Sequence, residues 1–333
     1  MPFNSLITRT DAAALIPEEV SREILDSVAD TSWLLRMASR LPDMNRAQTR
    51  LPVANGIPFA YFQDGDTGLI QTTEMDWTNR FIDAETLTVI VPIPKNVFAD
   101  TDYDLWGQNK PKLVDALNRA ATGAVLLGVT PAGQPIPQSW ATNMGAPGTP
   151  AAGILAGATA AGHVVSAANY VDLYEAILHE NGAGVDGVCM TVEADGFMVT
   201  GHVAAIPMRG RLRGVRDVGG QPIFMQSMQQ AGQYTLDGAP VYFPEDGIIN
   251  PATALMVSGQ WSKLVWALRQ DMEWEISTEA VITDAAGKVV LNLFQQNAVG
   301  LKVSMRIGFA LPNPRNYVNA NAATRFPFAV LTA

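Results

Sequence analysis

The stretch from Arg50 to Val91 constrains the fold more than any other part of the sequence, because it predicts a long two-stranded ribbon. Its outgoing arm, Arg50–Phe62, contains prolines and ends in alternating aromatic residues. The tip at Gln63–Gly68 is a run of turn-forming residues. The returning arm, Trp77–Val91, is rich in β-branched, aromatic and apolar residues, which is the composition of a strand.

A ribbon of this kind needs a surface to lie on. An isolated two-stranded hairpin is only marginally stable in water. Pro52 and Pro58 cannot donate hydrogen bonds to a sheet, so the outgoing arm suits an edge position. We therefore expect the ribbon to pack on another surface, and a second copy of the same chain is one candidate.

The charge content leaves two interpretations open. Charged residues make up 16% of the 333 residues, whereas about 25% is typical of globular proteins. Low-charge surface of this extent is hidden either in a large core or in obligate interfaces between subunits. The net charge of −10 argues against a protein that binds nucleic acid or an anionic membrane as a whole. An acidic inner wall would still suit a protein that encloses nucleic acid without adhering to it.

Targeting and redox signals are few. Residues Met1–Ile7 lack the basic start and apolar core of a signal peptide. The sequence has no run of 18 apolar residues, and the nearest candidate, Ala151–Ala168, is interpreted as a loop and not a membrane span. The single cysteine, Cys189, excludes a disulfide within the chain, and its apolar neighbours predict a buried thiol.

The strongest helical signal runs from Asp102 to Gly128, where apolar residues recur every three or four positions. Pro111 does not fit a helix interior, so either the main helix begins near Asn109 or a kink occurs at the proline. An earlier helix is predicted to begin at Pro17, which suits a first helical position, and to end before Pro42.

The middle of the chain gives weaker signals. Thr130–Ala168 is rich in Pro, Gly, Ala and Thr and is predicted to be a long loop. Asn169–Asp172 has the form of a capping box, so a helix is expected from there to Gly182. Gly187–Val192 is interpreted as a buried strand and Ala194–Ile206 as a helix.

The sequence after Gln221 predicts mostly strands. The clearest is Val299–Phe309, where apolar and polar residues alternate as in a long, half-exposed strand. A hairpin turn is expected at Asp284–Lys288. Shorter strands are expected at Pro240–Phe243, Ala254–Gly259, Leu264–Leu268 and Glu273–Thr278.

Motifs for catalysis are absent from the sequence, which has no Gly-x-Ser-x-Gly, phosphate loop, dinucleotide fingerprint or Cys-x-x-Cys. The three histidines, His163, His179 and His202, have no partners at metal or triad spacing and are interpreted as structural. The sequence therefore predicts a protein without enzyme activity, cofactor or metal.

Two charged clusters are candidates for contacts. The acidic cluster at the ribbon tip is too loosely spaced for a calcium loop, and it is either a solvated turn or a set of partners for a neighbour's arginines. Its members are Asp64, Asp66 and Glu74. The basic cluster favours bidentate ion pairs between subunits, with solvated surface and phosphate contact as alternatives. Its members are Arg209, Arg211, Arg213 and Arg216.

The order of elements is specific although no single motif is. A helix opens at Ile16–Val20, the ribbon follows, and a corner comes at Pro92–Pro94. A long helix with an Ala-rich face, Pro150–Leu155, the Gly238–Val241 strand and a strand-rich end with Met305–Gly308 come next. Over nearly the whole chain this order resembles the major capsid proteins of tailed bacteriophages with the Hong Kong 97-type fold.

The resemblance implies an α+β fold made of five segments. Residues 1–47 correspond to an N-arm and first helix, and residues 48–92 to the extended β-hairpin loop. Residues 93–165 correspond to a peripheral domain with a long spine helix and a Pro/Gly-rich loop. Residues 166–268 correspond to an axial domain, and residues 269–333 to the return to the peripheral domain with a C-terminal tail.

The same resemblance implies a structural protein of the virion capsid, assembled in the host cytoplasm. Its copies would form pentamers and hexamers of an icosahedral shell around double-stranded DNA, which they would meet only by non-specific proximity. The implied partners are copies of itself, a portal and a separate scaffold protein, with a decoration protein as a further candidate and no membrane. An encapsulin-type compartment and an uncharacterised enzyme are the alternatives.

Two departures from the family pattern refine this expectation. Some members are cross-linked through a lysine of the extended loop, but Arg50–Val91 contains no lysine, so a non-covalent shell is expected. Only 16 residues precede Pro17, so an N-terminal scaffolding domain is not expected. The predicted assembly contacts are the four arginines named above and a set on the ribbon: Phe59, Tyr61, Phe62, Asp64, Asp66 and Trp77.

Overall fold

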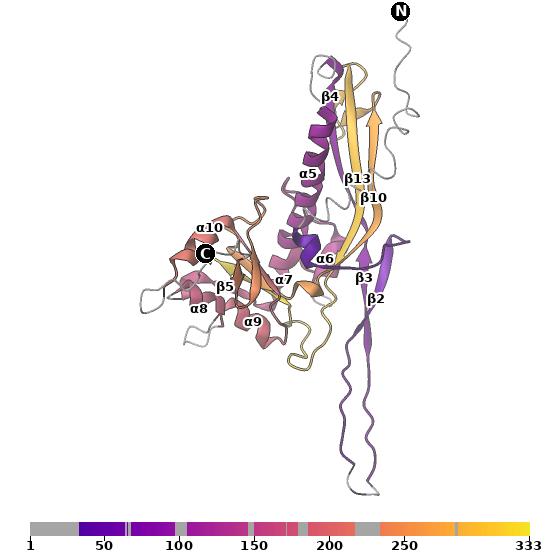
Figure 1. The fold of residues 1–333 in the computed structure, drawn as a ribbon. Helices are drawn as coiled ribbons and strands as arrows, with labels where there is room; N and C mark the ends of the chain where they lie inside the picture. Colours follow the sequence, from indigo (N-terminus) through magenta and orange to yellow (C-terminus); the bar gives the residue numbers. More distant parts are fainter. Residues whose placement is uncertain are drawn as a thin grey trace, which may run out of the picture.

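The computed structural model describes residues 33–63, 65, 68–96, 105–145, 150–170, 172–178, 186–216, 234–283 and 286–333. Residues 17–32 of the helix predicted from Pro17 lie outside these residues, as do Asp64, Asp66 and His179. The later part of that prediction is helical at Trp33–Met37. The described chain has three parts, and in Figure 1 one lies to the left while another extends below the third. They are a long four-stranded sheet with a helix along it, a lobe built on a six-stranded sheet, and a narrow ribbon.

The long sheet has the strand order β1-β10-β13-β4. Its strands are β1 (Ser39–Arg40), β10 (Val265–Ser277), β13 (Ala298–Ala310) and β4 (Glu85–Pro94). From Leu301 to Ile307 alternate residues of β13 are buried, which confirms the predicted alternation, whereas Gly308–Ala310 are all buried. A hairpin of β11 (Val281–Thr283) and β12 (Val289–Asn292) branches from its end, as the turn signal predicted.

Helix α5 (Leu105–Leu127) lies along the long sheet and confirms the strongest helical prediction. Leu113, Leu117 and Val303 share one apolar cluster, so the predicted stripe faces the sheet. The helix continues through Pro111, contrary to the alternative in which it begins near Asn109. Gly128 ends it with a φ of 75°, a conformation that glycine adopts without a Cβ penalty.

The lobe has the strand order β5-β14-β9-β6-β8-β7. Its strands are β5 (Val164–Ser166), β14 (Phe328–Thr332), β9 (Met256–Gly259), β6 (Gly201–Ala204), β8 (Ala239–Tyr242) and β7 (Thr235–Leu236). Helices α8 (Leu173–Leu178), α9 (Val188–Ala194) and α10 (Ile206–Gly214) share an apolar cluster with this sheet. Short 3-10 turns lie at Ala167–Asn169 and Trp261–Lys263. The buried thiol of Cys189 belongs to this cluster, as predicted, and burial raises its pKa to about 12.

Two predictions in the lobe are wrong. Gly187–Val192 was expected to be a strand, but Val188–Ala194 form helix α9, in which Val188, Cys189 and Val192 are buried at helical spacing. Ala194–Ile206 was expected to be a helix, but Gly201–Ala204 form β6, buried on both faces between β8 and β9. A short apolar run carries no period that separates a buried strand from a buried helix.

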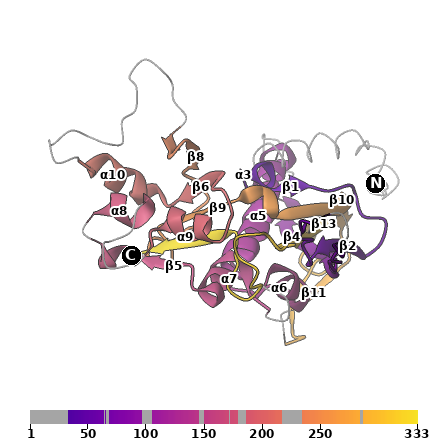
Figure 2. The same ribbon diagram turned by 90° about the horizontal axis from the view of Figure 1, so that it is seen from below.

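The predicted loop Thr130–Ala168 is also wrong, because it contains α6 (Gln138–Met144), α7 (Gly153–Ala161) and β5. Helix α7 is built from small residues because its surroundings are close: a Cβ on Gly157 would lie 2.4 Å from the ring of Phe326. Ile154 and Ala158 of α7 join Leu126 and Phe328 in one cluster. Figure 2 shows α7 at the junction of the lobe and the α5 side of the molecule.

The ribbon pairs β2 (Gln48–Ala54) with β3 (Trp77–Asp83), in register from Gln48↔Asp83 to Ala54↔Trp77. The returning arm is therefore two strands and not one, because β4 begins at Glu85 and pairs with β13 of the long sheet. Beyond Ala54 and Trp77 the two arms run on without a regular ladder in the residues described (Figure 1). We call residues 55–63 and 68–76 the distal ribbon.

The C-terminal residues lie in a different part from the one predicted. They were grouped with the peripheral segment, but β14 pairs with β5 and β9 inside the lobe sheet. The chain thus leaves the lobe after β9, runs out and back along the long sheet as β10 and β13, and returns to the lobe. Helix α3 (Trp33–Met37) packs through Trp33 and Leu34 into the apolar cluster that α5 shares with the long sheet.

Candidate functional site

The distal ribbon exposes large apolar side chains. The exposed fractions are 105% for Phe62, 93% for Leu69 and 81% for Ile70. Phe59–Gln63 and Leu69–Gln71 line opposite sides of a hollow of about 260 Å³ between the two arms. Burying one such side chain stabilises a contact by about 1.5–3 kcal/mol, so this surface favours association.

The structure places four of the ribbon residues named from the sequence, Phe59, Tyr61, Phe62 and Trp77, and all are exposed. It adds three that sequence reasoning missed: Leu69, Ile70 and Met75. The missed signal was the apolar pair Leu69-Ile70 directly after a run of turn residues, outside any strand pattern. A pair in that place has no core to join and points to a contact with another molecule.

The base of the ribbon, unlike its distal part, is held firmly. Ile82 is fully buried, and a Cβ on Gly308 would lie 2.6 Å from its side chain. Trp140 Nε1 donates to the carbonyl of Asp83 over 3.0 Å, and Asn143 Nδ2 donates to the Asp83 carboxylate over 2.8 Å. A fixed base therefore carries an exposed apolar tip.

The arginine cluster lies on α10 and just after it, in the lobe and apart from the ribbon (Figure 1). Arg209 lies over the ring of Tyr234, 4.7 Å from its centroid, and donates to its hydroxyl. The pKa of Tyr234 lies below its ordinary value. Burial alone would raise this pKa, but the hydrogen bonds from Arg213 and Arg209 have the larger, opposite effect. The helix thus presents several guanidinium groups together, which suits an acidic partner surface.

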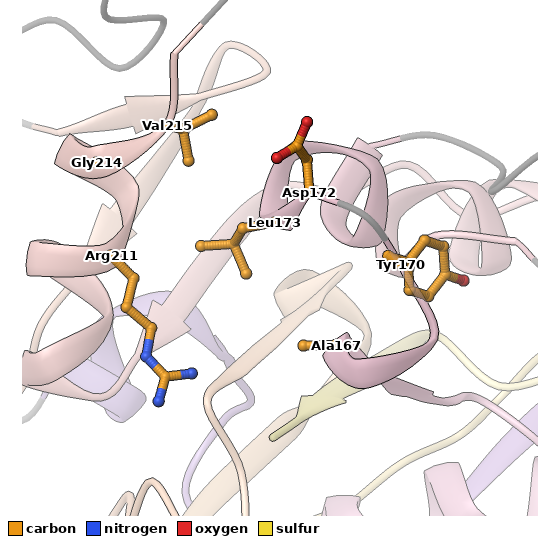
Figure 3. A pocket seen from close by; sticks show the side chains of 7 residues that line it. All are labelled: Ala167, Tyr170, Asp172, Leu173, Arg211, Gly214 and Val215. Carbon is orange, nitrogen blue, oxygen red and sulfur yellow. The ribbon is translucent and has the colours of Figure 1, made fainter.

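Arg211 borders a groove of about 430 Å³ between α10 and the start of α8. Figure 3 shows Arg211 on one wall, Asp172 and Leu173 on the other, and Ala167 below. Opposite charges across an open groove suit a partner that carries both signs. The groove and the distal ribbon are separate candidate contact surfaces.

The described histidines and acidic residues do not gather into a metal site. No group of three or more His, Cys, Asp or Glu side chains is placed to hold a metal ion in the part of the chain that the structure describes. His163 Nε2 lies 3.1 Å from the carboxylate of Asp195, and its Nδ1 lies 3.2 Å from the carbonyl of Phe328. Among the described residues, no helix is long and apolar enough to cross a membrane.

His202 is a buried structural residue whose hydrogen bonds define its tautomer. Its Nε2 lies 3.2 Å from the carbonyl of Leu236, which can only accept, so Nε2 is the donor. Nδ1 then accepts from the hydroxyl of Ser258 over 2.8 Å. This neutral imidazole joins β6, β7 and β9. Burial lowers the pKa of His202 to about 4, outweighing the opposite effects of the Leu236 carbonyl and Asp237.

The depressed pKa of His202 predicts a loss of stability in acid. Between pH 6.5 and about 4 the unfolded chain binds a proton that the folded chain does not, so the free energy of unfolding falls as the pH is lowered. The expected contribution is about 3 kcal/mol. Urea unfolding at pH 7 and pH 4.5, compared between the parent and His202→Gln, measures it. Equal pH dependence in the two proteins would refute it.

Comparison with known proteins gives a consistent result. The model of the phage capsid family matches residues 12–318. The major capsid protein of Staphylococcus phage 80alpha is 23% identical over 304 residues, which is 90% of this chain and 82% of that protein. A solved structure from Microbacterium phage Oxtober96 has a TM-score of 0.72 and 25% identity, covering 98% of this chain and 99% of its own. The capsid of a native GTA particle has a TM-score of 0.58 and 15% identity, with 91% of each chain covered.

Proposed function

This chain belongs to the phage capsid family, and we propose that its copies build the icosahedral shell of a tailed phage by joining through the distal ribbon. Its fold is the Hong Kong 97-type fold of phage capsid proteins. The observation that carries the proposal is the exposed apolar surface of Phe62, Leu69 and Ile70 on an arm with a fixed base. These side chains belong to no apolar cluster of their own subunit. Packing against a neighbouring subunit buries them.

The contacts that close a ring of subunits are head-to-tail, so two different surfaces of each subunit must match. We assign the distal ribbon to one such contact and the α10 arginines to another, around the axis of a pentamer or hexamer. The lobe then acts as the axial domain, and the long sheet with α5 acts as the peripheral domain. Of the segment predicted as N-arm and first helix, residues 33–47 pack within their own subunit through α3 and β1, so we assign the role of an arm that reaches a neighbour to residues 1–32.

The shell is held without covalent cross-links, since the ribbon from Arg50 to Val91 contains no lysine. Apolar burial at about 25 cal/mol per Å² over large obligate interfaces is sufficient for this. The assembly encloses double-stranded DNA and uses a portal and a separate scaffold protein, with a decoration protein as a further partner. An encapsulin compartment is not favoured, because the relatives named above are capsids of phages and of a GTA particle.

Expression of the full chain with electron microscopy of the product tests the proposal. We expect closed icosahedral particles, and we expect denaturing gels of heated particles to show a single band at 35.7 kDa. A ladder of higher bands would contradict the non-covalent contact. A small soluble oligomer that never forms particles, alone or with a co-expressed scaffold, would contradict the shell itself.

A further inference from the structure

The loop between β13 and β14, residues 311–327, touches two parts of the molecule that are otherwise far apart in sequence. We call it the connecting loop. It runs between the lobe and the ribbon and is drawn in yellow in Figure 1. On the ribbon side, Arg315 Nη1 donates to the carbonyl of Asn55 over 3.2 Å, and the backbone N–H of Arg315 donates to the carbonyl of Ala54 over 3.3 Å. These carbonyls lie where the β2–β3 ladder ends.

On the lobe side, the connecting loop is bound to Asp195, the residue that ends α9. Asn316 Nδ2 donates to its carbonyl over 2.6 Å, and Asn319 Nδ2 donates to its carboxylate over 2.7 Å. The other carboxylate oxygen accepts from the N–H of Phe326 over 2.7 Å and faces His163. Asp195 is only 7% exposed, so these bonds are formed away from water, where they are costly to break.

Between its two ends the connecting loop is braced by Arg325, whose side chain is 2% exposed. Arg325 donates to the side chain of Asn313 over 3.2 Å, to its carbonyl over 3.1 Å and to the carbonyl of Asn319 over 2.8 Å. Asn313 Nδ2 returns a bond to the carbonyl of Arg325 over 2.7 Å. Burial lowers the pKa of Arg325, while the charge of Asp195 opposes this shift. These hydrogen bonds join the two ends of the connecting loop to each other. We infer that the loop moves as one rigid unit and transmits a displacement of one end to the other.

We propose that the connecting loop is a strut that sets the direction of the distal ribbon relative to the lobe, with Arg315 as its positioning residue. Among the residues described, the hydrogen bonds between the ribbon and the rest of the subunit stop at Asn55. Beyond that point the hydrogen bonds of the described arm residues join one arm to the other, as in Gly56 N–H to the Asp76 carbonyl and Gln63 to Gly68. The last fixed point of a long arm decides where its tip lies.

The strut also couples the two contact surfaces of the subunit. A shift of α9 carries Asp195 with it, and the braced loop passes the shift to the carbonyls of Ala54 and Asn55. The direction in which the ribbon reaches its neighbour then depends on how the lobe sits in its ring. This consequence rests on the proposed function, whereas the strut itself is a property of one subunit.

Distance measurements between spin labels on the unassembled full chain test the strut. Cys189 is replaced by Ala, and labels are placed at the exposed positions Thr72 on the ribbon and Ala168 on the lobe. Arg315→Gln is expected to broaden and shift the distance distribution, because losing a hydrogen bond from a charged donor lowers the ratio of docked to undocked ribbon by roughly tenfold or more. Arg315→Lys is expected to recover part of the parent distribution.

Two further variants show whether the whole connecting loop, or only the contact of Arg315 with the ribbon, sets the direction of the ribbon. Arg46→Gln removes the same charge from an exposed arginine before β2 and should leave the distribution unchanged. Asn316→Ala with Asn319→Ala releases the lobe end and should broaden it as Arg315→Gln does. An unchanged distribution in Arg315→Gln, or an effect confined to that variant, would overturn the strut. Particle yield is read separately: a parent chain that never forms shells counts against the proposed function and leaves the label result standing.

Discussion

Deletion of residues 57–76 leaves a folded subunit that forms no closed shells. The deletion joins Ala54 and Trp77, which are paired in the parent, through Asn55-Gly56, and Asn-Gly is a favoured two-residue hairpin turn. Those of the removed residues that the structure describes are largely exposed and belong to no apolar core, so the melting temperature should stay within a few degrees of the parent. Electron microscopy and sedimentation should show subunits or small oligomers only.

A substitution series gives the same result with less change to the backbone. Phe62→Ser, Leu69→Ser and Ile70→Ser together remove an expected 5 kcal/mol or more, roughly, from each ribbon contact. The matched control changes polar neighbours instead, Gln71→Ser and Thr73→Ser, and should assemble like the parent. Shells of unchanged yield and heat stability from the apolar triple variant would show that the ribbon is not what joins the subunits.

Long, strongly periodic elements were predictable from the sequence. Asp102–Gly128 and Val299–Phe309 each repeat one pattern over several turns or pleats, and both appear as α5 and β13. The segments that became α9 and β6 show the opposite case, because Gly187–Val192 and Ala194–Ile206 were assigned to the wrong kind of structure. Those elements are short and buried, so tertiary packing decides between helix and strand.

The candidate site was predictable only in part, for a related reason. Exposed aromatic residues such as Phe62 and Trp77 stood out because nothing nearby could bury them. The bonds of Asp195 to His163, Asn319 and Phe326 could not be read from the sequence, since they join residues 32 to 131 positions apart. Only the folded chain brings these polar groups together.

Removal of residues 328–333 should prevent folding of the lobe, and this is the second large effect that we expect. Strand β14 pairs with β5 on one side and β9 on the other, so its loss leaves β5 without a partner and leaves one edge of β9 unpaired, although β9 still pairs with β6. Phe328, Val330 and Leu331 are fully buried. Their burial is worth roughly 5–9 kcal/mol, which is comparable with the whole stability of a typical domain.

The contacts of β14 explain why the loss of this strand should unfold the whole lobe and not only its edge. Phe328 and Val330 belong to the cluster shared with α5 and α7, whereas Ala329 and Leu331 belong to the cluster under α8, α9 and α10. One strand therefore closes both faces of the lobe, and the truncated chain should be insoluble or rapidly cleaved by protease. Deletion of the exposed Ala333 alone is the control, and Leu331→Ala should fold with a loss of about 2–5 kcal/mol in urea unfolding. A truncated chain with a parent-like cooperative transition would mean that the six-stranded sheet does not depend on its C-terminal strand.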